Sequence, residues 1–336
     1  MKVEESWFNI EDFNKRHLGW TDDSITHKHT LRKKKKYECA FFSCNNPTQR
    51  SHLLQRNGIL DRIATNGHVW MPTEKSCYDI KNRFKFDARG IKNDALAYPV
   101  FCNDHDKKIF SSIEDNPIDN RRKMDNLLLG YRAQVTERRK NEILRDISTS
   151  EFIKSILDKK PQYLINSYCS ESKSFNKPIS NSLIRETKLF SLIRGEFPID
   201  CFKTIYRELP RIEICSAAVF SFIEFVSSGN YYECPVYFSM IPYKDRTVVS
   251  ISYINPRAEK LLPLFNTQRT EKFLKFVSDI LLARVEDWAV SKRFYQKYIR
   301  PNEHEIIKQL SQNHLLNFKA FNSTIGVNLF DNYKNS

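Results

Sequence analysis

Four residues with metal-binding side chains occur as two short pairs in the first third of this 336-residue chain. Cys39 and Cys44 are separated by four residues, and Cys102 and His105 by two. Each pair offers two ligands from one tight turn, and two such turns supply the four ligands of a tetrahedral zinc site. The alternative is that the three cysteines are ordinary buried thiols, because cysteine is among the most buried residue types. The spacing favours the metal and predicts one structural zinc ion.

Two short strands and a helix must position these ligands. Residues 48–54 and 95–101 have strand composition, and the second strand leads directly into Cys102. Apolar residues at helical spacing then predict a helix that extends to Glu114, with Asp104 able to cap its start. The predicted order is strand, insertion, strand and helix, with metal ligands at the junctions.

The segments that combine ligands and elements in this way are Cys39-x4-Cys44, Ser51-His52, the strand ending Val100-Phe101-Cys102, and the helix start Cys102-Asn103-Asp104-His105-Asp106. Together they resemble the zinc-bound HNH, or His-Me finger, nucleases, over about residues 37–115. The resemblance implies a ββα element in which a histidine of the first strand is the general base. It also implies a helix residue that binds a catalytic divalent ion, and a structural zinc held by two ligand pairs.

Carried onto this chain, the resemblance assigns the general base to His52 and the ligand of a catalytic Mg²⁺ or Mn²⁺ ion to Asp106. It makes Asn93 the candidate for the asparagine that shapes the intervening loop. A neutral imidazole can take a proton from water, and a hard cation on a carboxylate can stabilise the scissile phosphate. His52 could instead be a structural imidazole, and Asp106 a carboxylate that interacts with the helix dipole.

This chain departs from the family pattern in three ways. Ser51 stands where an acidic residue often precedes the base, and His105-Asp106 replaces the closing Cys-His pair of many members. The insertion between His52 and Cys102 is also longer than in the compact form of the motif. These departures bear on catalysis more than on the fold.

The formal net charge of +14 favours a polyanionic partner, because clustered lysines and arginines release counterions from phosphates. A basic run lies directly before the first cysteine pair and is either a phosphate-contacting strip or a solvated segment. The residues predicted to hold nucleic-acid phosphates are Arg32, Lys33, Lys34, Lys35, Lys36 and Arg50.

The pattern predicts an α+β fold with three parts. These are an N-terminal arm with the basic run (1–36), the zinc-stapled ββα module (37–117), and a larger α+β domain with long helices and a β-hairpin (118–336). Glu137–Lys140 is expected on a solvated helix face. Further predicted elements are a brief helix over 59–64, an extended piece over 68–71, helices over 124–147, 183–193, 270–291 and 303–315, a strand or buried helix over 211–225, and a hairpin over 234–241 and 247–254.

The sequence thus predicts a metal-dependent endonuclease, with DNA favoured over RNA and, by analogy alone, a regulated role in defence. The alternatives are a noncatalytic zinc-finger protein that binds nucleic acid or a protein partner, and a structural zinc site in a protein whose function lies in residues 118–336. The C-terminal part carries no phosphate-binding loop or hydrolase motif and is expected to serve sensing, partner binding or homo-oligomer assembly. Sparse cysteines and the absence of a long apolar run predict a cytoplasmic protein without a membrane partner.

Overall fold

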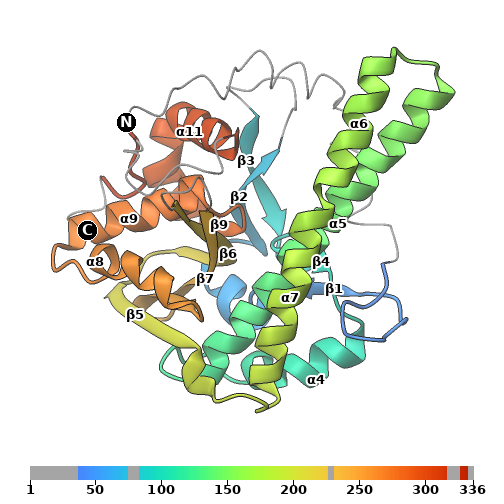
Figure 1. Cartoon of the computed structure of the whole chain (residues 1–336). Coiled ribbons are helices and arrows are strands. Elements are labelled where there is room, and N and C mark those ends of the chain that lie inside the picture. The colour runs from blue at the N-terminus through green and yellow to red at the C-terminus, as the bar shows by residue number, and fades with distance from the viewer. Residues whose placement is uncertain (1–36, 75–82, 226–230, 316–325, 332–336) are drawn as a thin grey trace.

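The computed structural model describes residues 37–74, 83–225, 231–315 and 326–331, and combines helices with strands as the α+β prediction requires (Figure 1). The strands are β1 (Arg50–His52), β2 (His68–Glu74), β3 (Phe84–Gly90), β4 (Ala97–Pro99), β5 (Lys203–Pro210), β6 (Ile214–Phe225), β7 (Tyr231–Pro242), β8 (Arg246–Tyr253) and β9 (Trp288–Val290). The longer helices are α4 (Asn103–Glu114), α5 (Lys123–Leu157), α6 (Gln162–Ser174), α7 (Asn176–Ile193), α9 (Thr270–Ala283) and α11 (Glu303–Leu315). The short turns of helix are η2 (Arg56–Leu60), α3 (Asp61–Ile63), η3 (Ile199–Cys201), η4 (Pro256–Leu261), α8 (Leu262–Phe265), α10 (Lys292–Phe294), η5 (Tyr295–Ile299) and η6 (Arg300–Asn302).

Two antiparallel sheets organise the chain. The smaller sheet pairs β1 with β4, and the larger has the order β3-β2-β9-β6-β7-β8-β5. Strands β2 and β3 come from the insertion between β1 and β4, yet they extend the sheet formed by β5 to β9. The larger sheet therefore includes strands from both sides of residue 117, the predicted end of the zinc module.

The two faces of the large sheet bury two separate apolar cores. Along β6, Ile214, Ala218 and Phe220 face the core under α8, α9 and α11, whereas Cys215 and Ala217 face the core under α5. This alternation follows from the period of two in a strand. Figure 1 shows α5 and α7 on one side of the sheet and the C-terminal helices on the other. The core under α5 also contains Cys39, Cys102 and residues of α4, so the predicted metal ligands are part of it.

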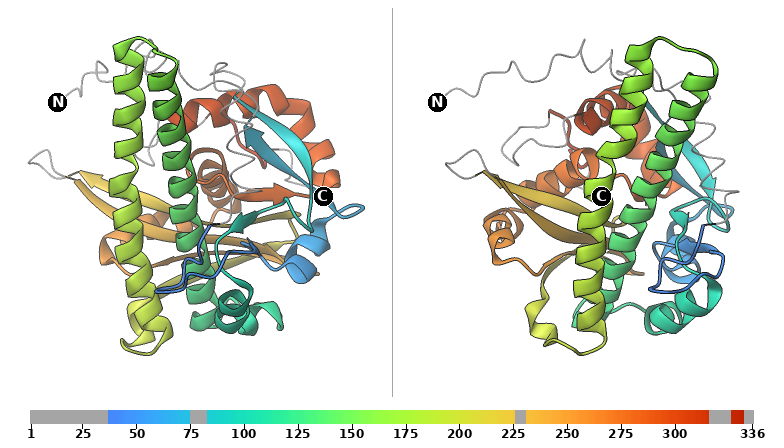
Figure 2. Two further views of the ribbon diagram at one scale, coloured as in Figure 1. Left: turned by 90° about the vertical axis from the view of Figure 1, so that its right-hand side faces the viewer. Right: turned by 45° about the vertical axis from the view of Figure 1, so that its right-hand side comes forward.

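Helix α5 packs against one face of the large sheet and against α4. Its 35 residues span about 52 Å at 1.5 Å per residue, and its distal half runs beside α6 and α7 beyond the sheet (Figure 2). Its first turns are buried on all sides. Close packing depends on Gly130, where a Cβ atom would lie 3.1 Å from Cγ of Tyr237 on β7. Among the described helices, none combines the length and apolar character that crossing a bilayer would require.

Several predicted elements differ in the structure. The helix predicted over 270–291 is wrong in its second half: α9 ends at Ala283, and Trp288–Val290 forms β9 in the middle of the large sheet. The ambiguous segment 211–225 is a strand, and the predicted hairpin is confirmed as β7 and β8. Strands β3 and β5 and helix α6 were not predicted.

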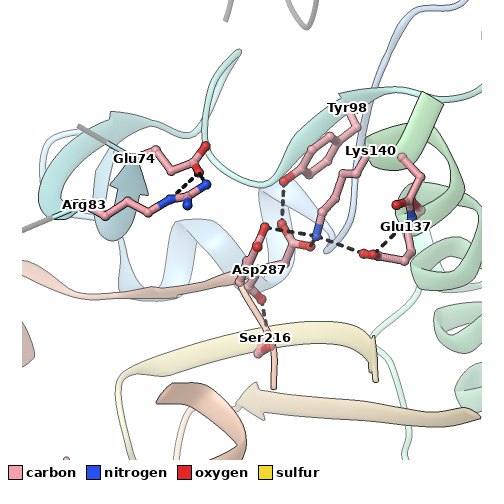
Figure 3. Close-up of polar contacts among 9 residues, drawn as sticks. Glu74, Arg83, Tyr98, Glu137, Lys140, Ser216 and Asp287 are labelled. Atoms are coloured by element: carbon pink, nitrogen blue, oxygen red, sulfur yellow. Dashed lines mark hydrogen bonds and ion pairs between the residues drawn. The ribbon is translucent and has the colours of Figure 1, made fainter. Parts of the chain in front are cut away.

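The predicted solvated face over Glu137–Lys140 is also wrong. Arg138 and Arg139 are buried, and the Lys140 ammonium lies 3.0 Å from a carboxylate oxygen of buried Asp287 (Figure 3). The Tyr98 hydroxyl of β4 donates to the other Asp287 oxygen at 2.5 Å. Glu137 and Glu286 approach Lys140 to 3.0 and 3.5 Å. Sequence periodicity could not find this cluster because its carboxylates come from distant segments.

This cluster ties α5 to β4 and to the segment before β9. Neighbouring carboxylates outweigh the effect of burial and hold the pKa of Lys140 well above its usual value, which keeps the ammonium charged. Ser216 of β6 donates to the Asp287 carbonyl at 2.7 Å, and this bond fixes Asp287 against the sheet. At the sheet edge, Arg83 and Glu74 form a second ion pair at 2.7 Å, also drawn in Figure 3.

We predict that Lys140→Met destabilises the protein by about 3–5 kcal/mol, because it leaves the buried Asp287 carboxylate without its cation. The measurement is the free energy of unfolding from urea denaturation. Lys154→Met, the same change at an exposed position of the same helix, should stay within about 0.5 kcal/mol of the parent. Equal stability of the two variants would show that the buried pair contributes nothing.

Candidate functional site

The four predicted metal ligands converge. Their ligand atoms all lie within 4.8 Å of one another. The Nδ1 atom of His105 lies 3.6 Å from Sγ of Cys39 and 3.2 Å from Sγ of Cys102, and the sulfurs of Cys44 and Cys102 are 3.9 Å apart. Zinc bonds of about 2.3 Å to sulfur and 2.0–2.1 Å to nitrogen give tetrahedral edges of about 3.5–3.8 Å. The cluster therefore has the dimensions and the donor set to hold a metal ion such as zinc.

Local backbone structure places each ligand pair. The turn that contains Cys39 and Cys44 is closed by a bond from the Cys39 amide to the Asn46 carbonyl at 2.8 Å. Ser43 adopts a φ of 59° within it. Cys102 is the N-cap residue of α4, with an extended backbone, and His105 lies in the first turn. The predicted cap at Asp104 is wrong, because Asp104 is inside that turn and no side chain caps the helix.

Helix α5 holds the turn of the first pair from outside. The guanidinium of Arg139 donates to the Glu38 carbonyl at 2.7 Å, and Arg138 donates to the Ala40 carbonyl at 3.2 Å. Arg138 is itself fixed by Glu186 of α7 at 2.8 Å. The residues flanking Cys39 are thus anchored by buried arginines. In the sequence, the run of three cations in one helix was the one sign of this anchoring.

Burial and neighbouring groups shift the pKa values of two of the thiols in opposite directions. Burial raises the pKa of Cys39 to about 11. At Cys102 burial acts in the same direction, but the His105 and Asp104 amides and the Cys39 and Cys44 thiols outweigh it and lower the pKa. Buried thiolates need a compensating positive charge, and a bound metal ion supplies one.

His52 lies beside this cluster on β1, opposite Ala97 of β4. One imidazole nitrogen, Nε2, lies 2.8 Å from the Ile91 carbonyl oxygen. A carbonyl only accepts, so Nε2 carries the proton in the neutral ring and Nδ1 is the basic nitrogen. Burial lowers the pKa of His52, which keeps the ring neutral near pH 7. The state that a general base requires is therefore favoured.

Asp106 of α4 lies next to Ser51 of β1. Its side chain is hydrogen bonded to Ser51 and lies 3.4 Å from Nη2 of Arg132. Arg132 also pairs with Glu114, and its guanidinium carbon lies 3.9 Å from the Phe110 ring centre. Burial raises the pKa of Asp106, while the charge of Arg132 opposes that shift. Asp106 keeps 28% of its side-chain surface exposed, whereas Arg132 keeps only 2%.

As a site for a catalytic cation, this arrangement offers two partly exposed carboxylates, Asp106 and Glu114, which both pair with Arg132. The Cys-His cluster is the sole group of three or more potential ligands that converge within the described ranges. A Mg²⁺ ion can bind through one or two carboxylates if it keeps several waters. Asp106 fits that mode, with Arg132 as a competing cation.

The remaining predicted residues lie elsewhere or outside the described ranges. Asn93 is exposed in the turn before β4, and it is its neighbour Asp94 that lies 3.5 Å from Arg50. The basic run from Arg32 to Lys36 lies outside the described residues. Sequence reasoning missed Arg132 and Glu114. An arginine inside the apolar run Leu127–Val135 was a usable signal, because a buried cation needs a partner.

The chain matches no protein-family model, and no curated protein or solved structure matches it either. The case for a function therefore depends on the geometry of the two adjacent sites.

We predict that the purified chain binds about one zinc ion and that Cys44→Ser removes it. Loss of the ion should lower the thermal midpoint by about 5 °C or more. In a chain of this size each kcal/mol of lost unfolding free energy lowers the midpoint by about 2–4 °C at most, and a structural zinc site contributes several kcal/mol. Elemental analysis and a thermal melt measure the two effects. The control is Cys201→Ser at an exposed cysteine, which should keep both the zinc and the midpoint. Full zinc content in Cys44→Ser would contradict the ligand assignment.

Proposed function

We propose that this protein is a metal-dependent endonuclease that hydrolyses phosphodiester bonds of nucleic acid, with DNA favoured. The observation that carries the proposal is that Asp106, on the first turn of α4, interacts with Ser51 and with the charge of His52 on β1, and directly follows His105 of the Cys-His cluster. The two residues are 54 positions apart in the sequence, and the Cys-His cluster lies where the turn before β1 meets the start of α4.

In the proposed reaction, Nδ1 of His52 takes a proton from the attacking water, because Nε2 is committed to the Ile91 carbonyl. Ser51 and Arg132 hold the Asp106 carboxylate in position from within the fold. A Mg²⁺ or Mn²⁺ ion on Asp106, when bound, supplies positive charge for the scissile phosphate and the leaving oxygen. Arg132 is a positioning residue, since its buried side chain does not reach a substrate.

The net charge of +14 supports a nucleic-acid substrate, because phosphate contacts by lysine and arginine give sequence-independent affinity. A regulated role in defence remains an analogy that no residue described above supports by itself.

A specific observation favours a second function, that of a noncatalytic zinc module which binds nucleic acid or a protein. Arg132 already provides a positive charge 3.4 Å from Asp106, where the nuclease proposal requires a divalent ion. If that ion pair is permanent, Asp106 serves the fold and no ion binds. The two functions differ in their response to divalent ions.

We predict that plasmid DNA is cut in Mg²⁺ or Mn²⁺ and that His52→Ala slows cleavage by about 10²–10⁴-fold, the usual contribution of a general base. The assay compares initial nicking rates at equal zinc content. His68→Ala is the matched control, because His68 is exposed and bonds only the local Asn66 carbonyl at 2.8 Å among the contacts described. It should cut like the parent.

Asp106→Asn separates the two functions. The nuclease should lose cleavage and its dependence on divalent ions, whereas a binding module should bind DNA as before and be indifferent to Mg²⁺. If the folded, zinc-loaded parent cuts neither DNA nor RNA, or if His52→Ala cuts at the parental rate, the nuclease proposal is wrong.

A further inference from the structure

A cavity of about 410 Å³ lies at the far end of α4 from the Cys-His cluster. Its walls are the 116–122 connection between α4 and α5, strands β5 and β8, and Tyr243 in the turn that joins β7 to β8. This volume is within the range of small-molecule sites, about 300–1,000 Å³. Neither the Cys-His cluster nor His52 lines the cavity, so the endonuclease proposal leaves it without a role.

Three arginines contribute to the lining. Arg121 lies 3.2 Å from Glu208, and Nε of Arg246 lies 3.6 Å from the other oxygen of the same carboxylate. The third, Arg122, approaches Asp119 only to 3.9 Å. Arg246 also lies 3.2 Å from Asp245, so the three guanidinium groups face three carboxylates. The three arginine side chains keep 65%, 63% and 40% of their surface exposed, so N–H donors of these groups remain accessible to an anion.

Two tyrosines complete the site. Tyr206 of β5 keeps 43% of its surface exposed beside Arg121, so its ring is available for stacking. The Tyr243 hydroxyl is fixed instead, 2.7 Å from the Ile118 carbonyl oxygen and 2.7 Å from the side-chain oxygen of Asn120. An exposed aromatic ring next to guanidinium groups is the combination that holds a base together with its phosphate.

The floor of the cavity is rigid. Asn120 is buried and its amide nitrogen lies within hydrogen-bond distance of Asn126, Ser239 and Ser250. These residues come from α5, β7 and β8, so the cavity wall is part of the main fold. A site formed before its ligand arrives loses less entropy on binding.

We infer that this cavity binds a nucleotide, with the phosphates on Arg121, Arg122 and Arg246 and the base against Tyr206. The nucleotide is either a free nucleoside phosphate or one unit of a strand. The residues around the cavity suit a free nucleotide and a nucleic-acid strand alike. Arg62 of α3 lies over the Tyr243 ring at 5.7 Å and adds a cation beside the cavity, and α3 follows β1, which carries His52. Binding here needs neither His52 nor the metal cluster, so the inference stands apart from the proposed nuclease.

The test measures binding of ATP by calorimetry, and of a fluorescein-labelled dT12 strand by anisotropy, to the full chain without divalent ions. The variant is Arg121→Gln/Arg122→Gln, whose two side chains are 65% and 63% exposed and should not affect folding. The control is Arg194→Gln, a 63% exposed arginine paired with Glu196 away from the cavity. We expect the double variant to weaken binding by at least about tenfold and the control to leave it unchanged.

Two further comparisons identify what is bound. ATP binding that depends on the arginines indicates a free nucleotide, and dT12 binding that depends on them without ATP binding indicates a strand. Tyr206→Ala should weaken ATP or dT12 but leave inorganic triphosphate unaffected, which a purely electrostatic surface would not do. The inference is overturned if neither probe binds, or if the folded double variant binds both as tightly as the parent. Because cleavage is never measured, failure here leaves the nuclease proposal to its own test.

Discussion

Three thiols and one imidazole held within 4.8 Å of one another are the constraint around which the N-terminal third is arranged. Buried sulfur ligands of this kind are stable together as thiolates only if a cation compensates their charge. A metal ion bound there would join the turn of Cys39 and Cys44 to the first turn of α4. β1 and β4 lie between these two segments in the chain, so a metal ion on the four ligands would hold both strands, and with them His52, in place.

Helix α5 supplies the support from the other side. Arg138 and Arg139 bind carbonyl groups of the turn of Cys39 and Cys44, Lys140 reaches β4 through Asp287 and Tyr98, and Arg132 holds Asp106. Four cations of one helix thus connect the candidate site to the large sheet. The three arginines are buried, Lys140 is largely buried, and all four are paired with carboxylates, an arrangement whose loss costs more than that of an exposed ion pair. The candidate site and the C-terminal part are consequently one mechanical unit, joined by a common core and a common sheet.

The sequence was informative where the signal is local. The spacing of Cys39, Cys44, Cys102 and His105 identified the cluster. Apolar residues at helical spacing identified α4, and the strand pattern on either side of a turn identified the hairpin of β7 and β8. It failed where the signal depends on a distant partner. Trp288–Val290 is a strand because β2 and β6 leave a place between them, and Glu137–Lys140 is buried because Asp287 and Glu186 come from elsewhere in the chain. The cavity beside Tyr206 is built from segments more than eighty residues apart, and no local pattern could have predicted it.

X-ray absorption at the zinc edge tests the central claim most directly, because it reports the ligand atoms of the metal in the intact protein. The structure predicts three sulfur atoms at about 2.3 Å and one nitrogen at about 2.0–2.1 Å. A shell of nitrogen and oxygen atoms alone, or a protein that is folded and free of zinc, would contradict the account, because the four ligands would then not be what holds β1, β4 and α4 together.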